Sequence, residues 1–355
     1  MLNFNPEGKK VILSVDGGGM RGMISIAMLA ELERMTGKTC QQLFDMVGGT
    51  STGAIIAAGL GIGMTAAEIL ETVYRDRLPK AFAPNNVFLW IRYLLGGLRH
   101  IYPIEPFIEA VQPLAQGIKV GDITHPIVFM TTKDVRIGDT YYIVSKGPGR
   151  EAVKDWPLSG AVGASGAAPI YFPPVAGNLI DGGVGVNSNP CLAVAIEAME
   201  YIGVEADFYN DNVMLISLGT GYVPNLHGEG AATKFWLKDW IQYLILKGLD
   251  DSALQQAYST QAIYGSRIDF RRYNPELTWE NLANAFDLTP DIDPTRLSLD
   301  SHSPAQVDLM EQIGRVYARK IDWLQPTVMP WDTIGGHRKP NIKRADVDWS
   351  KTPFK

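Results

Sequence analysis

The sequence predicts an α/β fold built around a mostly parallel β-sheet. Two successive strand–turn–helix units near the N-terminus favour this class, because such units imply right-handed crossovers between parallel strands. Later apolar runs at 126–132, 140–145 and 213–221 have the pattern of further strands. The composition also fits, since 46% of the 355 residues are hydrophobic and 20% are charged, as in ordinary globular proteins.

The first unit spans residues 11–36. V-I-L-S-V (11–15) is predicted to be a strand, and D-G-G-G-M-R-G (16–22) the turn that follows it. I-S-I-A-M-L-A-E-L-E-R-M-T (24–36) has helical apolar spacing and stops before Gly37, a residue suited to the position after a helix. The second unit has a strand at 43–47, the turn G-G-T-S-T-G and a helix of small residues from 54 to 60.

The remaining chain continues this alternation. Residues 62–120 are mainly helical in pattern, a small-residue helix at 158–169 suits close packing on the sheet, and amphipathic helices are predicted at 234–247 and 305–318. The change of pattern near residue 222 is compatible with a domain boundary. We favour one domain over residues 1–330, with a core at 9–221, additional helices at 222–330 and a basic C-terminal tail at 331–355.

Charge and cysteine content narrow the class of protein. The formal net charge is −6, so no global basic field indicates a nucleic-acid polymer as partner. Cys40 and Cys191 have no spacing typical of disulfides or zinc sites, which fits a reducing compartment. The N-terminus has no signal-peptide pattern, and the apolar stretches 54–64 and 88–95 are too short to span a bilayer. We therefore expect a soluble, cytoplasmic protein.

Residues 47–54, V-G-G-T-S-T-G-A, contain a serine with a glycine two positions away on each side. Gly49, Ser51 and Gly53 match the G-x-S-x-G pattern of a nucleophile elbow, in which the serine occupies a strained turn between strand and helix. Side chains at the two glycine positions would collide with the neighbouring strand and helix. The pattern also occurs by chance in unrelated loops, but its place in a strand–turn–helix unit favours a catalytic Ser51.

The glycine run D-G-G-G-M-R-G (16–22) has two functional interpretations. Its G-x-G-x-x-G spacing is that of a dinucleotide-binding loop, but such a loop needs an acidic residue at the end of the next strand, where this chain has glycines and a serine. The other interpretation is an oxyanion hole formed by the N–H groups of Gly17, Gly18 and Gly19, with Arg21 adding positive charge. A purely structural turn would not need three consecutive glycines.

A serine nucleophile also needs a proton acceptor within hydrogen-bonding distance. Asp181, in N-L-I-D-G-G (178–183), ends an apolar run and precedes two glycines, so its carboxylate can project from a strand end into a cleft. Asp-Gly is common in ordinary turns as well. The five histidines all lie in loops or polar segments, and we prefer Asp181 as the base; they are His100, His125, His227, His302 and His337.

These motifs, in this order, resemble those of the patatin-like phospholipases. The resemblance rests on G-G-G-M-R-G, G-T-S-T-G and D-G-G, with A-S-G-A-A-P-I-Y-F-P-P (164–174) and S-L-G-T-G (217–221) as further shared blocks, and it covers residues 9–221. It implies a three-layer α/β/α sandwich around a central, mostly parallel sheet. It also implies hydrolysis of acyl esters in membrane phospholipids or other lipids, without a metal or cofactor.

The same resemblance implies a site and partners. The implied site consists of Ser51 as nucleophile, Asp181 as base, and an oxyanion hole of Gly17, Gly18, Gly19 and Arg21. The implied partner is a phospholipid membrane surface, reached from the cytoplasm at the inner face of the membrane. Some bacterial relatives are activated by cyclic nucleotides in antiphage defence, so a nucleotide-gated effector is one alternative, although no nucleotide-binding motif is recognisable. A dinucleotide-dependent oxidoreductase and a non-catalytic lipid-binding protein are the alternatives outside the family.

Two further segments suggest contact with a membrane. Residues 82–94 combine aromatic side chains, Trp90 among them, with Arg92, which suits a lid at the bilayer interface and equally suits a helix that covers the sheet. Residues 338–355 carry six Lys or Arg against Asp346 and Asp348, a local net charge of +4 that favours anionic lipid surfaces. A solvated or packed tail without a binding role is the alternative.

Overall fold

The structure is a computed structural model, and the residues that it describes are 1–82, 100–112, 117–224, 230–236, 239, 240, 243 and 247–325. Several sequence predictions lie outside these residues. They are the proposed lid from residue 83 onward, the basic tail, His227, His337 and half of the helix predicted at 234–247.

Seven strands of the described chain form one mixed sheet, in the order β4–β3–β2–β1–β6–β7, with β5 paired to β3. The strands are β1 (Lys10–Val15), β2 (Met46–Gly49), β3 (Ile127–Asp134), β4 (Asp139–Val144), β5 (Leu179–Asp181), β6 (Val213–Leu218) and β7 (Asp269–Tyr273). Strands β3, β2, β1, β6 and β7 pair in parallel, whereas β4 and β5 run antiparallel to β3. The predicted mostly parallel sheet is confirmed.

Two strands differ from the sequence prediction. The strand predicted at 43–47 begins only at Met46, because the chain first forms the short helix α2 (Cys40–Leu43). Thr39 and Gln42 form a capping box at the N-terminus of this helix. Strand β7 was not predicted, since its sequence D-F-R-R-Y lacks an apolar run. Its buried arginines pair with carboxylates, Arg271 with Asp269 and Arg272 with Asp16.

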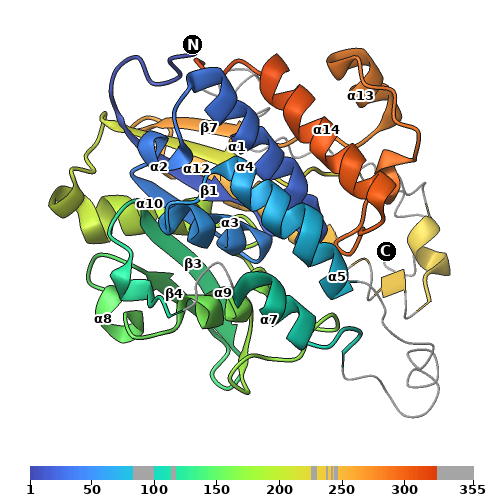
Figure 1. The fold of residues 1–355 in the computed structure, drawn as a ribbon, viewed down its shortest axis with the longest axis horizontal. Helices are drawn as coiled ribbons and strands as arrows, with labels where there is room; N and C mark the ends of the chain where they lie inside the picture. Colours follow the sequence, from blue (N-terminus) through green and yellow to red (C-terminus); the bar gives the residue numbers. More distant parts are fainter. Residues whose placement is uncertain are drawn as a thin grey trace, which may run out of the picture.

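Side chains alternate between two hydrophobic cores on the two faces of the sheet. In β1, Val11, Leu13 and Val15 enter one core and Ile12 enters the other. Helices that contribute to the first core are α1 (Gly22–Thr36), α3 (Thr52–Gly61), α4 (Ala66–Ile69), α5 (Leu78–Phe82), α7 (Glu105–Val111), α9 (Leu158–Gly166) and α14 (Pro304–Lys320). Helices α10 (Cys191–Ile196) and α12 (Gly248–Tyr264) contribute to the second. The predicted α/β/α sandwich is confirmed (Figure 1).

The shorter elements lie between or beside these layers. A π-helical turn, Leu70–Arg77, joins α4 to α5, and another, Glu197–Ile202, follows α10. Helix α8 (Arg150–Val153) follows β4, and α13 (Trp279–Phe286) packs on α14 through the rings of Phe286 and Tyr317. None of the helices in the described residues is long and apolar enough to cross a membrane.

Helix α1 is anchored by α14, which lies alongside it (Figure 1). The fully buried side chain of Glu31 in α1 pairs with Arg34 at 2.6 Å, with Arg319 of α14 at 2.7 Å and with Arg315 of α14 at 3.6 Å. Burial alone would raise the pKa of Glu31, but hydrogen bonds from Arg34 and Arg319 lower it to about 2. The glycine loop that precedes α1 is therefore attached to a helix held firmly by the C-terminal part of the fold.

Candidate active site

The turn between β2 and α3 holds Ser51 in a strained conformation. Ser51 has φ +56° and ψ −119°, a backbone region that residues other than glycine rarely occupy and that costs about 1–3 kcal/mol. A Cβ atom on Gly49 would lie 2.1 Å from the carbonyl carbon of Gly53, and one on Gly53 would lie 2.2 Å from the carbonyl oxygen of Val15. Both glycines are thus sterically required, as the elbow pattern predicts.

A neighbouring helix holds the backbone of the elbow. The N–H of Ser51 donates to Oγ of Ser165 at 2.9 Å, and Ser165 is fully buried in α9. Ser165 has no role among the sequence predictions, although it lies in A-S-G-A-A-P, part of a block shared with the patatin-like phospholipases. This hydrogen bond connects the elbow to a segment more than 100 residues away.

Asp181 ends β5, which pairs with β3 such that Asp181 lies opposite Thr132. Its side chain is almost fully buried, and the N–H of Gly183 donates to its Oδ1 at 2.7 Å. Burial raises the pKa of Asp181 to about 6, and a hydrogen-bonding interaction with the Ser51 side chain and the Gly183 N–H both oppose this rise. The carboxyl group is therefore ionised mostly at neutral pH and can take up a proton near pH 6.

Ser51 and Asp181 line one cavity of about 470 Å³, together with Gly17, Gly18 and Gly19. The elbow glycines and Arg21 are not among the residues that line it. The wall is largely apolar and includes Ile55, Leu78, Phe82, Phe107, Phe172 and Leu249. A cavity of this size, apolar apart from a few convergent polar groups, is typical of a site for a small or chain-like apolar ligand.

The N–H groups of the glycine loop are not equivalent. The N–H of Gly17 donates to the carbonyl of Ser188 at 2.8 Å, and the N–H of Met20 donates to the carbonyl of Leu299 at 2.7 Å. For Gly18 and Gly19, no acceptor of the N–H lies among the described residues. Of the three glycines predicted as donors, two thus have N–H groups available to a ligand, and Gly17 has its N–H already bonded within the protein.

Arg21, at the end of the glycine loop, does not line the cavity. Its guanidinium group is nearly buried and lies 3.6 Å from Oδ1 of Asp250, at the start of α12. Its guanidinium group thus interacts with a carboxylate of the protein. The structure does not bring Arg21 into the cavity with the glycines predicted to form the oxyanion hole.

The described histidines lie elsewhere. His125 contacts the carbonyl of Gln41, His302 contacts the carbonyl of Asp300, and neither they nor His100 line the cavity. Among the described residues that line the cavity with Ser51, Asp181 is thus the carboxyl group, and Tyr171, whose pKa burial raises to about 12, is the other titratable side chain.

Comparison with known proteins assigns the chain to a family. A family model described as patatin-like phospholipase matches residues 13–195, just over half of the chain, and this range contains the glycine loop, Ser51 and Asp181. The chain belongs to the patatin-like phospholipase family.

Phospholipases and a patatin-like protein from several organisms are similar to the chain. The intracellular phospholipase A2 of Caenorhabditis elegans is 30% identical over 241 residues, which are 63% of this chain and 21% of that protein. The cGAMP-activated phospholipase of Escherichia coli (strain TW11681) is 27% identical over 224 residues, 59% of this chain and 61% of that protein. Patatin-like protein 2 of Arabidopsis thaliana is 27% identical over 366 residues, 87% of this chain and 83% of that protein. The match thus spans less than two thirds of the first two relatives.

Proposed function

We propose that the protein is a lipid acyl hydrolase that cleaves acyl esters of membrane phospholipids through a dyad of Ser51 and Asp181. The observation that carries this proposal is the cavity itself. A serine in a strained elbow, a buried carboxyl group with a pKa of about 6 and two glycines whose N–H groups have no acceptor among the described residues line the same apolar space. Membership of the patatin-like phospholipase family supports the choice of a phospholipid ester as substrate.

The first half-reaction forms an acyl-enzyme. Asp181 accepts the proton of Ser51 Oγ as this oxygen attacks the ester carbonyl carbon, and negative charge develops on the carbonyl oxygen. The N–H groups of Gly18 and Gly19 donate to that oxygen, and each such donor is worth about 3 kcal/mol in the transition state. The proton held by Asp181 then passes to the leaving alcohol as the carbon–oxygen bond of the ester breaks.

The second half-reaction returns the enzyme to its starting state. Asp181 accepts a proton from a water molecule that attacks the acyl carbon, the same N–H groups bind the developing oxyanion, and the proton passes to Ser51 Oγ as the fatty acid leaves. The apolar wall of the cavity accommodates the acyl chain in both steps.

Vesicles of mixed phospholipids test this proposal, with released fatty acids and lysophospholipids identified by mass spectrometry. We expect Ser51→Ala and Asp181→Asn each to lower turnover by more than about 1000-fold, and the double variant to be no worse, because the two residues act as a unit. The control is Ser266→Ala, an exposed serine remote from the cavity, which should be fully active. Vesicle binding without product release would instead indicate a non-catalytic lipid-binding protein.

A nucleotide-gated form of the same activity is the second candidate. Its support is the relative in Escherichia coli, which is named a cGAMP-activated phospholipase. The vesicle assay is therefore run with and without cGAMP. Product release only in its presence would support the gated enzyme, and equal release in both arms would contradict it.

We further propose that the enzyme works from the cytoplasm as a peripheral protein at the inner membrane surface. The support for this is the substrate, since phospholipid esters lie in the membrane, together with the reducing compartment that the two buried, unpaired cysteines fit. Fractionation of cells, with detection of the protein in the cytosolic and membrane fractions at low and high salt, tests this location.

A further inference from the structure

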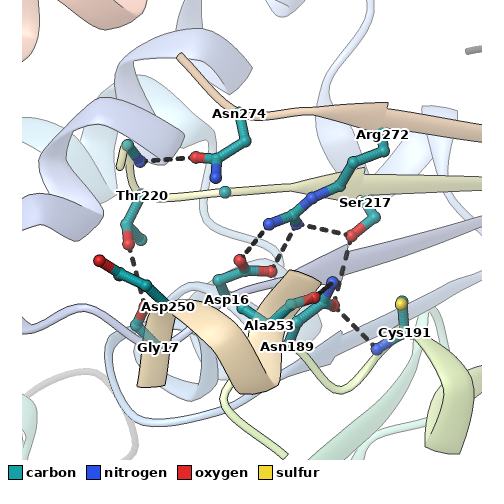
Figure 2. Close-up of polar contacts among 12 residues, drawn as sticks. Asp16, Gly17, Asn189, Cys191, Ser217, Thr220, Asp250, Ala253, Arg272 and Asn274 are labelled. Carbon is teal, nitrogen blue, oxygen red and sulfur yellow. Dashed lines mark hydrogen bonds and ion pairs between the residues drawn. The ribbon is translucent and has the colours of Figure 1, made fainter. Parts of the chain in front are cut away.

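The block S-L-G-T-G, which follows the proposed catalytic motifs in the sequence, lies directly behind the glycine loop. It spans the end of β6 and the turn after it, and Oγ1 of Thr220 in this turn donates to the carbonyl oxygen of Gly17 at 2.9 Å (Figure 2). Thr220 is 3% exposed and is not among the residues that line the cavity. Its hydroxyl therefore contacts the loop on the side away from the proposed substrate.

The hydrogen bond from Thr220 determines which way the next N–H group points. The peptide bond between Gly17 and Gly18 is trans and planar, so its carbonyl oxygen and its N–H point in opposite directions. Because Thr220 holds the carbonyl oxygen of Gly17, the N–H of Gly18 is directed away from Thr220. Gly18 lines the cavity and Thr220 does not, so the direction away from Thr220 is the one expected to face the cavity.

Thr220 is itself held rigidly in its turn. The N–H of Gly219, on one side of it, donates to the carbonyl of Tyr273 at 2.8 Å. The N–H of Gly221, on the other side, donates to Oδ1 of Asn274 at 2.8 Å (Figure 2). Both partners belong to β7 or to the residue that follows it. The hydroxyl thus projects from a backbone whose N–H groups on both sides of Thr220 are hydrogen-bonded to Tyr273 and Asn274, and not to the glycine loop.

The residue before the loop is anchored from the same two strands. Asp16 accepts two hydrogen bonds from Arg272 of β7, at 2.7 and 2.5 Å, and Arg272 also donates to Oγ of Ser217 in β6 at 2.9 Å (Figure 2). The side chains of Asp16 and Arg272 are 4% and 8% exposed, so this bidentate pair is shielded from solvent. The loop is thereby fixed at Asp16 by an ion pair and at Gly17 by Thr220.

We propose that Thr220 is a positioning residue of the enzyme, which holds the N–H of Gly18 in the direction needed to bind the oxyanion. This inference rests on the proposed hydrolysis by Ser51. Thr220 does not touch the substrate; it acts through the Gly17–Gly18 peptide. The pair of Asp16 and Arg272 is the second anchor, which keeps the start of the loop in register with β6.

Replacement of the hydroxyl by a methyl group of similar size tests the proposal. In Thr220→Val the Gly17–Gly18 peptide loses the hydroxyl that orients it. We expect kcat to fall by about 10- to 100-fold while KM changes by less than about 3-fold, because the N–H of Gly18 binds the oxyanion in the transition state. Thr220→Ser retains the hydroxyl and should recover most of the lost kcat. The matched control is Thr36→Val, because Thr36 is buried at the end of α1 and donates to the carbonyl of Leu32 at 2.8 Å, remote from the cavity.

A second measurement separates positioning from a merely structural role. A trifluoromethyl ketone with a fatty acyl chain forms an oxyanion when the serine attacks it, so its affinity should fall in Thr220→Val by the same factor as kcat/KM. General loosening of the fold would lower the thermal midpoint without this proportionality. If Thr220→Val does not fold, Thr220→Cys is compared with Thr220→Ser, because a thiol is a weaker donor and should give the lower kcat.

The outcomes distinguish this inference from the proposed function. Unchanged kcat in a folded Thr220→Val, a serine variant no better than the valine or cysteine variant, or ketone affinity that stays constant while kcat falls would each overturn the positioning role alone. If the unaltered protein neither releases fatty acid nor binds the ketone, with or without cGAMP, the proposed function fails, and the inference fails with it.

Discussion

Replacing Asp181 with asparagine separates the cost of burying the proposed base from its chemical role. Burial raises the pKa of Asp181 from an ordinary value of 3.8 to about 6. Each pKa unit corresponds to about 1.36 kcal/mol, so the ionised carboxylate lowers the free energy of unfolding by about 3 kcal/mol. The folded state binds the proton more tightly than the unfolded state. Stability should therefore be greatest below pH 3.8, fall as the pH rises to about 6, and then stay constant.

Asparagine does not titrate, so Asp181→Asn should lack this pH dependence. We expect the variant to gain about 3 kcal/mol in free energy of unfolding relative to the unaltered protein at pH 7.5, and about half as much at pH 5. Hydrolysis should be lost at both values. Urea unfolding followed by tryptophan fluorescence measures the first effect, and fatty-acid release measures the second.

The control removes a carboxylate at the surface. Asp155 is largely exposed beside Lys119, which holds its pKa below the ordinary value, so Asp155→Asn should alter neither hydrolysis nor the change in stability between pH 5 and 7.5. An Asp181→Asn variant with the same pH dependence as the unaltered protein would refute the argument, because the pKa of Asp181 would then be unaffected by its burial.

Three further predictions concern the same site. The value of kcat/KM should fall below pH 6 and reach about one tenth of its plateau at pH 5, as Asp181 becomes protonated, and a flat profile down to pH 5 would contradict its role as base. Gly18→Ala should lower kcat by about 100-fold, because the added Cβ would lie 2.2 Å from Oγ1 of Thr220 and must displace the loop. Steady-state kinetics on a soluble ester measure this effect. An unchanged kcat would argue against an oxyanion hole at Gly18. Ser165→Ala should leave the N–H of Ser51 without its acceptor, lower the free energy of unfolding in urea by about 1–3 kcal/mol, and lower kcat. If the variant loses stability but keeps full activity, the role of Ser165 is purely structural.

The sequence by itself determined the features that depend on local conformation and hydrophobic pattern. The parallel sheet was predictable from those strands that are apolar runs next to a turn and a helix, such as β1 with the loop before α1. The elbow was predictable because only glycine fits at Gly49 and Gly53, where neighbouring backbone approaches within about 2.2 Å of an added Cβ. Steric requirements of this kind leave a signature at the residue itself.

Tertiary structure alone decided which groups are available for chemistry. Gly17, Gly18 and Gly19 are the same residue type, yet the N–H of Gly17 donates to the carbonyl of Ser188 from a distant segment. The N–H groups of Gly18 and Gly19 have no acceptor among the described residues. Strand β7 escaped prediction because its arginines are buried against distant segments: Arg272 pairs with Asp16, and Arg271 donates to the carbonyl of Phe4. Whether a polar group is satisfied depends on which distant segment faces it, and no local pattern of residues records that pairing.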